Sequence, residues 1–214
     1  MKNYGIIFDL DGTLWDVADV THMSANEVAE KHGLNYVTKK AVLDSFGLPK
    51  EGSAKNFFPD LPLSVSLPYT EEIIASNIDN LFKYGGKLYP DVVGVLEALS
   101  ENYDLFIVTN SPFRRYAESF IASTKTSAYF KEYYSAGELG LLKSQALKKI
   151  VDDFRLEKAV YVGDTQMDFE ATAEAGLPFI FANYGFGEAE GAKYVISSMK
   201  ELPGAVERVF GLKE

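Results

Sequence analysis

Three short apolar segments of this sequence are each followed directly by polar residues that can do chemistry. The segments cover residues 6–8, 105–108 and 160–162, and the polar residues after them are Asp9, Asp11, Thr13, Thr109, Asn110, Asp164 and Asp168. If the segments are parallel strands of one sheet, their carboxyl ends meet at one edge, which is where ligands bind in open α/β sheets. We therefore expect these side chains to surround a single crevice, although they are far apart in the sequence.

Four of these side chains are carboxylates, and four carboxylates gathered at one edge favour a bound cation. Neighbouring like charges raise one another's pKa, so the group cannot ionise easily without one. Any single aspartate at such a place is more often a helix N-cap or a turn residue, but that alternative is weak for four together. Because Mg²⁺ prefers oxygen ligands and takes one or two carboxylates while it keeps several waters, the pattern predicts a magnesium site.

The composition excludes several other kinds of chemistry. The 214 residues include no cysteine and only two histidines, His22 and His32. Thiolate nucleophiles and cysteine-based zinc sites are therefore excluded, and serine–histidine hydrolysis and multi-histidine metal sites are strongly disfavoured. Catalysis must rest on carboxylates, hydroxyls and lysines.

Charge and hydropathy indicate where the protein works and what it does not bind. The chain has 21 basic and 31 acidic residues and a net charge of −10, whereas a protein that binds nucleic acid needs clustered lysine and arginine. No segment approaches the roughly 20 apolar residues of a membrane span, and a charge comes too early at the N-terminus for a signal peptide. We expect a cytoplasmic protein without nucleic-acid or membrane partners.

The elements that must position the polar residues are those of an α/β fold. The three apolar segments and a fourth at residues 179–181 are short and uninterrupted, as strands covered on both faces should be. Between them, Leu147, Ile150, Val151 and Phe154 have helical spacing, and so do Val92, Leu96 and Leu99 after Pro90, which we place in the first helical turn. Strands that alternate with helices predict a doubly wound parallel sheet.

Residues 15–86 interrupt this alternation. They contain apolar residues at helical spacing but no convincing buried strand, and residues 57–69 hold three prolines and are expected to be irregular. Gly85 and Gly86 then mark a return to the sheet. We interpret residues 15–86 as a helical domain inserted into an α/β core that is formed by residues 1–14 and 87–214.

At this point the sequence resembles a known family. The run Asp9-Leu10-Asp11-Gly12-Thr13-Leu14 is similar to the DxDGT(L) signature of the haloacid-dehalogenase-like superfamily of phosphatases and mutases, and residues 163–168 resemble its GDxxxD motif. Thr109 and Lys143 follow in the family's order, and the resemblance covers the whole core. The inserted helical segment lies where the phosphoglycolate-phosphatase-like and β-phosphoglucomutase-like branch carries its cap domain.

The resemblance implies a role for each aspartate. Asp9 is expected to attack phosphorus and form an aspartyl-phosphate, and Asp11 to act as general acid and then as general base. Mg²⁺ would be held by the Asp9 carboxylate, the backbone carbonyl of Asp11 and the Asp164 carboxylate, with Asp168 outside this set. Thr13 would brace the acidic loop by hydrogen bonding. A carboxylic acid at position 11 favours phosphate esters, because the dehalogenases of the superfamily lack one there.

The same resemblance assigns the groups that bind the phosphoryl oxygens. Thr109 and the Asn110 amide would contact them, and Lys143 would neutralise the charge of the phosphate and keep Asp9 ionised. In this branch the lysine motif is often Lys-Pro-x-Pro, whereas Lys143 is followed by Ser144-Gln145-Ala146. Lys148 and Lys149 are therefore alternative candidates.

The cap is expected to exclude water and to recognise the leaving group. Within it, residues 46–50 resemble the family's loop that faces the active site, so Lys50, with Lys55 as the alternative, is the candidate specificity residue. The predicted function is Mg²⁺-dependent hydrolysis of a small phosphorylated metabolite, a phosphate monoester that is phosphoglycolate-like or a sugar phosphate, by a monomer or weak homodimer. The alternatives are a phosphosugar mutase of the β-phosphoglucomutase type and a non-catalytic protein that binds a phosphometabolite.

Overall fold

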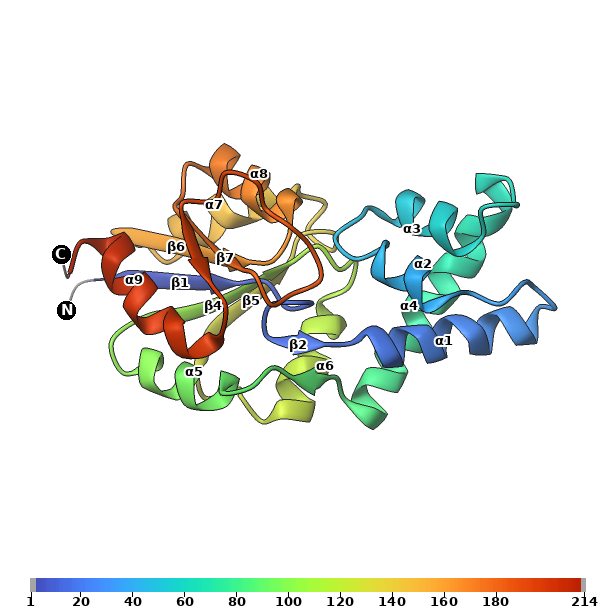
Figure 1. Cartoon of the computed structure of the whole chain (residues 1–214), viewed down its shortest axis with the longest axis horizontal. Helices are drawn as coiled ribbons and strands as arrows, with labels where there is room; N and C mark the ends of the chain where they lie inside the picture. The colour runs from blue at the N-terminus through green and yellow to red at the C-terminus, as the bar shows by residue number, and fades with distance from the viewer. Residues whose placement is uncertain (1–2, 213–214) are drawn as a thin grey trace.

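The computed structural model describes residues 3–212, and its centre is a six-stranded parallel sheet with helices on both faces (Figure 1). The sheet has the order β5-β4-β1-β6-β7-β8. Its strands are β1 (Tyr4–Phe8), β4 (Asp104–Thr109), β5 (Phe130–Ser135), β6 (Lys158–Gly163), β7 (Phe179–Ala182) and β8 (Tyr194–Ile196). The helices around it are α5 (Val92–Ser100), α6 (Arg114–Thr124), α7 (Lys143–Asp153), α8 (Gln166–Ala175), the 3₁₀ helix η1 (Met199–Glu201) and α9 (Leu202–Phe210).

The α/β prediction is confirmed, and all four predicted strands are present. Within this sheet, the two strands that the sequence did not indicate, β5 and β8, are the edges. β5 contains two charged residues beside three aromatic ones and is mostly half-buried, and β8 has only three residues. An edge strand is covered less completely than a central one, so it lacks the uninterrupted apolar sequence by which the central strands were recognised.

Two layers of apolar side chains hold the helices on the sheet. Ile6 and Phe8 of β1 pack with residues of α5, α6 and α9 on one face, whereas Ile7 packs with residues of α7 on the other. Successive residues of a strand point to opposite faces, so a strand buried on both sides must be apolar at every position. This explains why β1 shows no alternation of polar and apolar residues.

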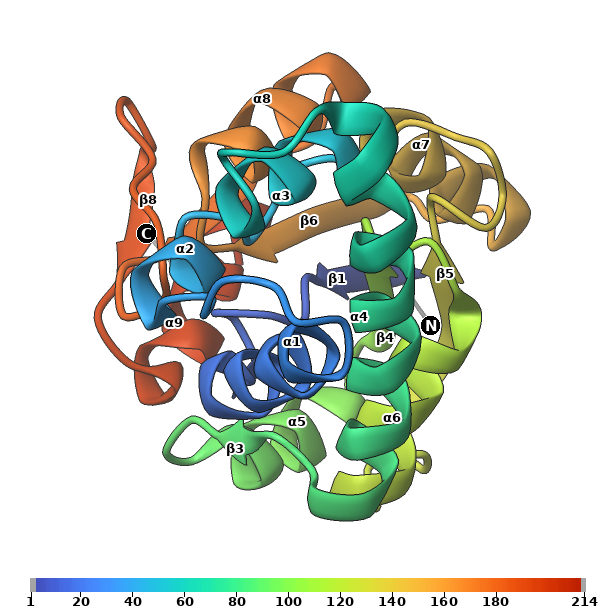
Figure 2. The ribbon, with the colours of Figure 1, turned by 90° about the vertical axis from the view of Figure 1, so that its right-hand side faces the viewer.

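Beyond the carboxyl ends of the strands lies a second group of helices, α1 (Ala18–Lys31), α2 (Lys39–Leu43), α3 (Lys50–Phe57) and α4 (Leu63–Tyr84) (Figure 1). They share a core of their own, which includes Val28, Val42, Phe57 and Ile73. Figure 2 views the molecule from this side, with α1, α3 and α4 in front of the sheet. No helix within residues 3–212 is long and apolar enough to cross a membrane.

The prediction that residues 57–69 are irregular was wrong for most of this range. α4 begins at Leu63 and contains Pro68. Proline lacks the N–H that a helix interior uses and normally ends or kinks a helix. Here Pro68 is exposed, while Ile73, Ile78 and Leu81 of the same helix are buried. Tertiary packing of this apolar face contributes more to the stability of the helix than the proline costs.

The chain leaves and re-enters the core through a short antiparallel ribbon of β2 (Trp15–Asp16) and β3 (Lys87–Leu88). A Cβ on Gly86 would lie 2.6 Å from the Trp15 ring, so only glycine allows the two segments to approach this closely. The prediction that Pro90 lies in the first turn of α5 was wrong. Asp91 has a φ of 67°, and the helix begins only at Val92.

Candidate active site

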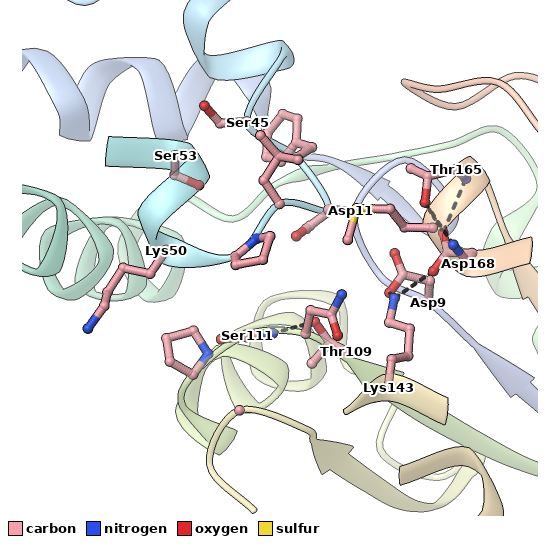
Figure 3. A pocket seen from close by; sticks show the side chains of 18 of the residues that line it. Asp9, Asp11, Ser45, Lys50, Ser53, Thr109, Ser111, Lys143, Thr165 and Asp168 are labelled. Carbon is pink, nitrogen blue, oxygen red and sulfur yellow. Dashed lines mark hydrogen bonds and ion pairs between the residues drawn. The ribbon is translucent and has the colours of Figure 1, made fainter. Parts of the chain in front are cut away.

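A cavity of about 610 Å³ lies between the carboxyl ends of the central strands and the helices α1–α4. Asp9, Asp11 and Thr109 come from the ends of β1 and β4, and Lys143 and Asp168 from the first turns of α7 and α8. Figure 3 shows these five side chains converging at one end of the cavity. The structure therefore brings together residues that the sequence placed at separate strand ends.

Asp9 lies at the centre of this group. Its backbone N–H donates to the carbonyl of Val162, which fixes the end of β1 beside β6. The Oδ1 atom accepts a hydrogen bond from Lys143 Nζ at 2.8 Å, and the Tyr161 hydroxyl lies 3.3 Å from it. Among the described residues no hydrogen bond or ion pair reaches Oδ2, so this oxygen is free to contact a ligand. Burial raises the pKa of Asp9 to about 7, and the positive charge of Lys143 opposes that rise.

Lys143 links two aspartates. It is the first residue of α7, is only 8% exposed, and its Nζ also lies 2.6 Å from Asp168 Oδ1. The two carboxylates raise the pKa of Lys143 above its ordinary value although burial lowers it, so the ammonium stays charged. The alternative candidates Lys148 and Lys149 do not line the cavity. A buried charge is retained only when it is paired, which is the case here.

Asp168 is held by α8 itself. Its Oδ2 accepts hydrogen bonds from the Thr165 hydroxyl at 2.7 Å and the Thr165 N–H at 3.1 Å, while the Asp168 N–H donates to Thr165 Oγ1. This reciprocal pair is a capping box at the start of α8. Because Lys143 occupies the other oxygen, both oxygens of Asp168 are already engaged.

Asp164 is fully buried at the end of β6. Its Oδ2 accepts from the N–H of Phe186 at 2.8 Å, and its Oδ1 accepts from the Thr13 hydroxyl at 3.3 Å. Burial, followed by the charges of Asp168 and Asp9, raises the pKa of Asp164 well above its ordinary value. Two neutral donors do not compensate this charge, and a cation beside it would.

The donor set fits a hard divalent cation. Carboxylate oxygens of Asp9, Asp164 and Asp168 all lie within 4.8 Å of one another, and all three residues are buried. Within the described part of the chain, Asp9 has one oxygen without a hydrogen bond, and the oxygens of Asp164 accept hydrogen bonds only from neutral donors. Both oxygens of Asp168 are engaged, by Lys143 and by Thr165. Carboxylate-rich sites of this kind suit Mg²⁺.

Gly12 is the residue that lets the acidic loop pass Asp164. It has a φ of +80°, and a Cβ placed there would lie 2.0 Å from Asp164 Oδ2. We expect Gly12→Ala to lower the free energy of unfolding by about 3 kcal/mol or more, from backbone strain and steric overlap together. Gly33 also has a positive φ but has nothing within 4 Å of its Cβ position, so Gly33→Ala is the matched control.

Urea denaturation of both variants measures the difference. In Gly33→Ala the free energy of unfolding should fall by only about 1–2 kcal/mol, which is the cost of a left-handed backbone conformation for alanine. Equal losses in the two variants would contradict a steric role for Asp164.

Asp11 is oriented by two aromatic residues. The indole N–H of Trp15 and the hydroxyl of Tyr116 both donate to Asp11 Oδ1, at 2.8 and 2.7 Å. Burial raises the pKa of Asp11 to about 6, although both hydrogen bonds lower it. Sequence analysis did not assign these partners. For Trp15, its position four residues after Asp11 was the only local sign of this contact. Tyr116 comes from α6, and nothing in the local sequence indicates its contact with Asp11.

The remaining residues line the cavity on opposite sides. Thr109 is buried and accepts from the N–H of Ser111, and Asn110 is half-buried beside it. Lys50 lies at the far wall, where its Nζ is 2.5 Å from Glu71 Oε1, and Figure 3 shows it directed away from Asp9. Lys55 is exposed and does not line the cavity.

Known proteins resemble this chain over most of its length. The family model of haloacid dehalogenase-like hydrolases matches residues 6–182. The chain is 27% identical to a phosphoglycolate phosphatase of Rhodobacter capsulatus, over 94% of this chain and 96% of that protein. A phosphoglycolate phosphatase of Aquifex aeolicus is also 27% identical, over 85% of each chain.

Solved structures show the same fold. A haloacid dehalogenase-like protein from Streptococcus pneumoniae aligns with a TM-score of 0.82 at 21% identity, over 95% of this chain and 98% of the other. A predicted phosphoglycolate phosphatase from Haemophilus somnus aligns with a TM-score of 0.84 at 21% identity, over 96% and 99%. With the match to the family model over most of its length, the chain belongs to the haloacid dehalogenase-like hydrolases.

Proposed function

We propose that this protein is a Mg²⁺-dependent phosphatase that hydrolyses a small phosphate monoester through an aspartyl-phosphate. One observation carries the proposal: the buried Asp9 carboxylate, paired on one oxygen with Lys143, faces a cavity that Asp11 also lines. The relatives named phosphoglycolate phosphatase support the reaction type. Their identities of 27% leave the leaving group open.

In the first half of the reaction Asp9 Oδ2 attacks phosphorus and the bond from phosphorus to the ester oxygen breaks. Asp11 donates its proton to that oxygen, so the leaving group departs as a neutral alcohol. Trp15 and Tyr116 hold Oδ1 of Asp11, which leaves Oδ2 to carry the proton. The raised pKa of Asp11 increases the fraction of the protonated form that this step requires.

In the second half Asp11, now ionised, removes a proton from water. The water oxygen attacks phosphorus, the bond between phosphorus and Asp9 breaks, and inorganic phosphate leaves. Thr109 and Asn110 would contact the phosphoryl oxygens, and Lys143 would contribute a positive charge beside them.

Asp9, Asp164 and the backbone carbonyl of Asp11 would hold Mg²⁺, with Asp168 outside this set because its oxygens are engaged. When bound, the ion supplies charge that stabilises the phosphoryl oxygens and offsets repulsion between the carboxylates and the substrate. We also propose residues 15–86 as the cap domain and residues 1–14 and 87–214 as the core. The contributions of α1, α3 and α4 to the cavity support this division.

Release of inorganic phosphate from p-nitrophenyl phosphate in the presence of Mg²⁺ tests the proposed function. Inorganic phosphate distinguishes hydrolysis from a mutase, which returns the phosphoryl group to a bound sugar. Absence of any release from this and a panel of other phosphate esters would overturn the proposal and favour a binding protein.

Asp11→Asn should distinguish an acid from a merely structural carboxylate. An alkyl phosphate needs a proton on its leaving oxygen, whereas an aryl oxide leaves with little assistance, so we expect about a hundredfold loss of kcat on alkyl esters. The loss on aryl esters should be smaller, although the second half still needs the base. Steady-state kinetics on glycerol phosphate and p-nitrophenyl phosphate measures the two losses, and equal losses would indicate that Asp11 only positions other groups.

A further inference from the structure

Three buried side-chain oxygens within residues 3–212 have no hydrogen-bond partner, and all three belong to residues that line the active-site cavity. They are Thr21 Oγ1 on α1, Asn77 Oδ1 on α4 and Ser144 Oγ on α7. Ser144 follows Lys143 at the phosphate end. Thr21 and Asn77, 8% and 7% exposed, belong to the helices α1 and α4 that lie beyond the sheet.

Unpartnered atoms of this kind indicate what the cavity binds. Buried polar groups in folded proteins are nearly always hydrogen-bonded, and leaving one unsatisfied costs stability. The packing around Thr21 and Asn77 therefore leaves each residue with a hydrogen-bonding oxygen that no protein group uses. A ligand with hydroxyl groups would satisfy both, because a hydroxyl donates to the Asn77 oxygen and donates to or accepts from the Thr21 hydroxyl.

The charges around the cavity disfavour a carboxylate on the leaving group. Among the described residues, the basic side chains that line it are Lys50, which is paired with Glu71, and Lys143, which is paired with Asp9 and Asp168. The acidic residues that line it are Asp9, Asp11, Asp168, Glu170 and Glu174. A carboxylate would meet this excess of negative charge, and it could not donate a hydrogen bond to Asn77.

The size and the apolar part of the lining point to a leaving group larger than two carbons. Apolar residues on the side of α2, α3 and α4 include Val42, Leu48, Phe57, Ile73 and Ile74. Together with a volume of about 610 Å³, they offer contact area for the C–H groups of a sugar or polyol chain.

We infer that the leaving group is a neutral, polyhydroxylated alcohol of the sugar or polyol class, bound by Thr21 and Asn77. This inference rests on the proposed phosphatase function and deepens it. It assigns to this chain a substrate class different from the carboxylate-bearing phosphoglycolate in the names of its relatives.

A panel of paired esters tests the substrate class. The neutral members are the terminal phosphates of ribose, glucose and glycerol, the anionic members are phosphoglycolate and phosphoglycerate, and p-nitrophenyl phosphate is the reference. We expect the best neutral ester to exceed both anionic esters in kcat/KM by at least about tenfold, the worth of one hydrogen bond and an avoided repulsion. A higher kcat/KM for phosphoglycolate than for every neutral ester overturns the inference, and its loss in Lys50→Ala would identify Lys50 as the carboxylate contact instead.

Two isosteric variants test the residues. Thr21→Val and Asn77→Leu remove the unpartnered oxygens and keep the shape of the side chains. Each should lower the ratio of kcat/KM for the best neutral ester to that for p-nitrophenyl phosphate by about tenfold. The melting temperatures of both variants should equal or exceed that of the wild type. Each substitution removes a buried polar group without a partner, and such a group destabilises the folded state.

Asn80→Leu is the matched control for Asn77. Asn80 lies on the same helix as Asn77, but its side-chain amide donates hydrogen bonds to Ser24 and Glu27, and it does not line the cavity. We expect Asn80→Leu to have a lower melting temperature than the wild type. Its ratio of kcat/KM for the best neutral ester to that for p-nitrophenyl phosphate should stay at the wild-type value. Wild-type ratios in Thr21→Val and Asn77→Leu would overturn the assignment of these residues. Failure of the wild type to hydrolyse any ester would overturn the phosphatase function itself, which separates the two failures.

Discussion

Asp9→Asn should lower kcat for phosphate ester hydrolysis by at least about a thousandfold, because the amide oxygen is a poor nucleophile and no aspartyl-phosphate can form. The variant should remain folded. Asparagine is nearly isosteric with aspartate, and the substitution removes one of several carboxylates crowded around the site, while Lys143 keeps its ion pair with Asp168. Steady-state kinetics and a melting curve measure the two effects.

A second readout identifies the nucleophile directly. Acid quenching of the wild-type enzyme during turnover should trap phosphate on the protein, and Asp9→Asn should trap none. Asp152→Asn on the exposed side of α7 is the control, since it makes the same chemical change away from the cavity. Turnover of Asp9→Asn at the wild-type rate would remove Asp9 from the nucleophile role.

Removal of Mg²⁺ should have a comparable effect. We expect EDTA to lower activity at least about a hundredfold, since the phosphate dianion must otherwise approach buried Asp9 and Asp164 without charge compensation. Added Mg²⁺ should restore the activity. Ca²⁺ should inhibit, because its larger and looser coordination does not keep the substrate in line.

The metal also has a readout that does not depend on turnover. Binding to the folded state raises the melting temperature with ligand concentration, so Mg²⁺ should stabilise the wild-type protein. Asp164→Asn should reduce this stabilisation, and Asp152→Asn should keep it. Undiminished hydrolysis in EDTA, or identical Mg²⁺ stabilisation of Asp164→Asn and wild type, would refute the metal site.

The sequence by itself determined the central sheet and the residues at its carboxyl edge. β1, β4, β6 and β7 are buried on both faces, so their local sequence is apolar at almost every position and can be recognised without knowledge of the fold. The residues that follow these strands share one edge because the strands are parallel, which is why Asp9, Thr109 and Asp164 could be placed near one another.

The edges of the sheet and the start of α4 could not be predicted in this way. β5 carries charged residues because one side of it is open, and α4 contains Pro68 because packing elsewhere along the helix outweighs its local cost. Local propensity contributes only part of the stability of such elements, so the sequence pattern alone gives an incomplete account of them.

The connections within the site were decided by tertiary structure alone. Tyr116 reaches Asp11 from α6, and Lys143 at the start of α7 joins Asp9 to Asp168 of α8. Thr21 and Asn77 become exceptional only once the surrounding helices bury them without a partner. A hydrogen bond or its absence depends on positions to within a fraction of an ångström, and those positions follow from the packing of elements far apart in the chain rather than from spacing along it.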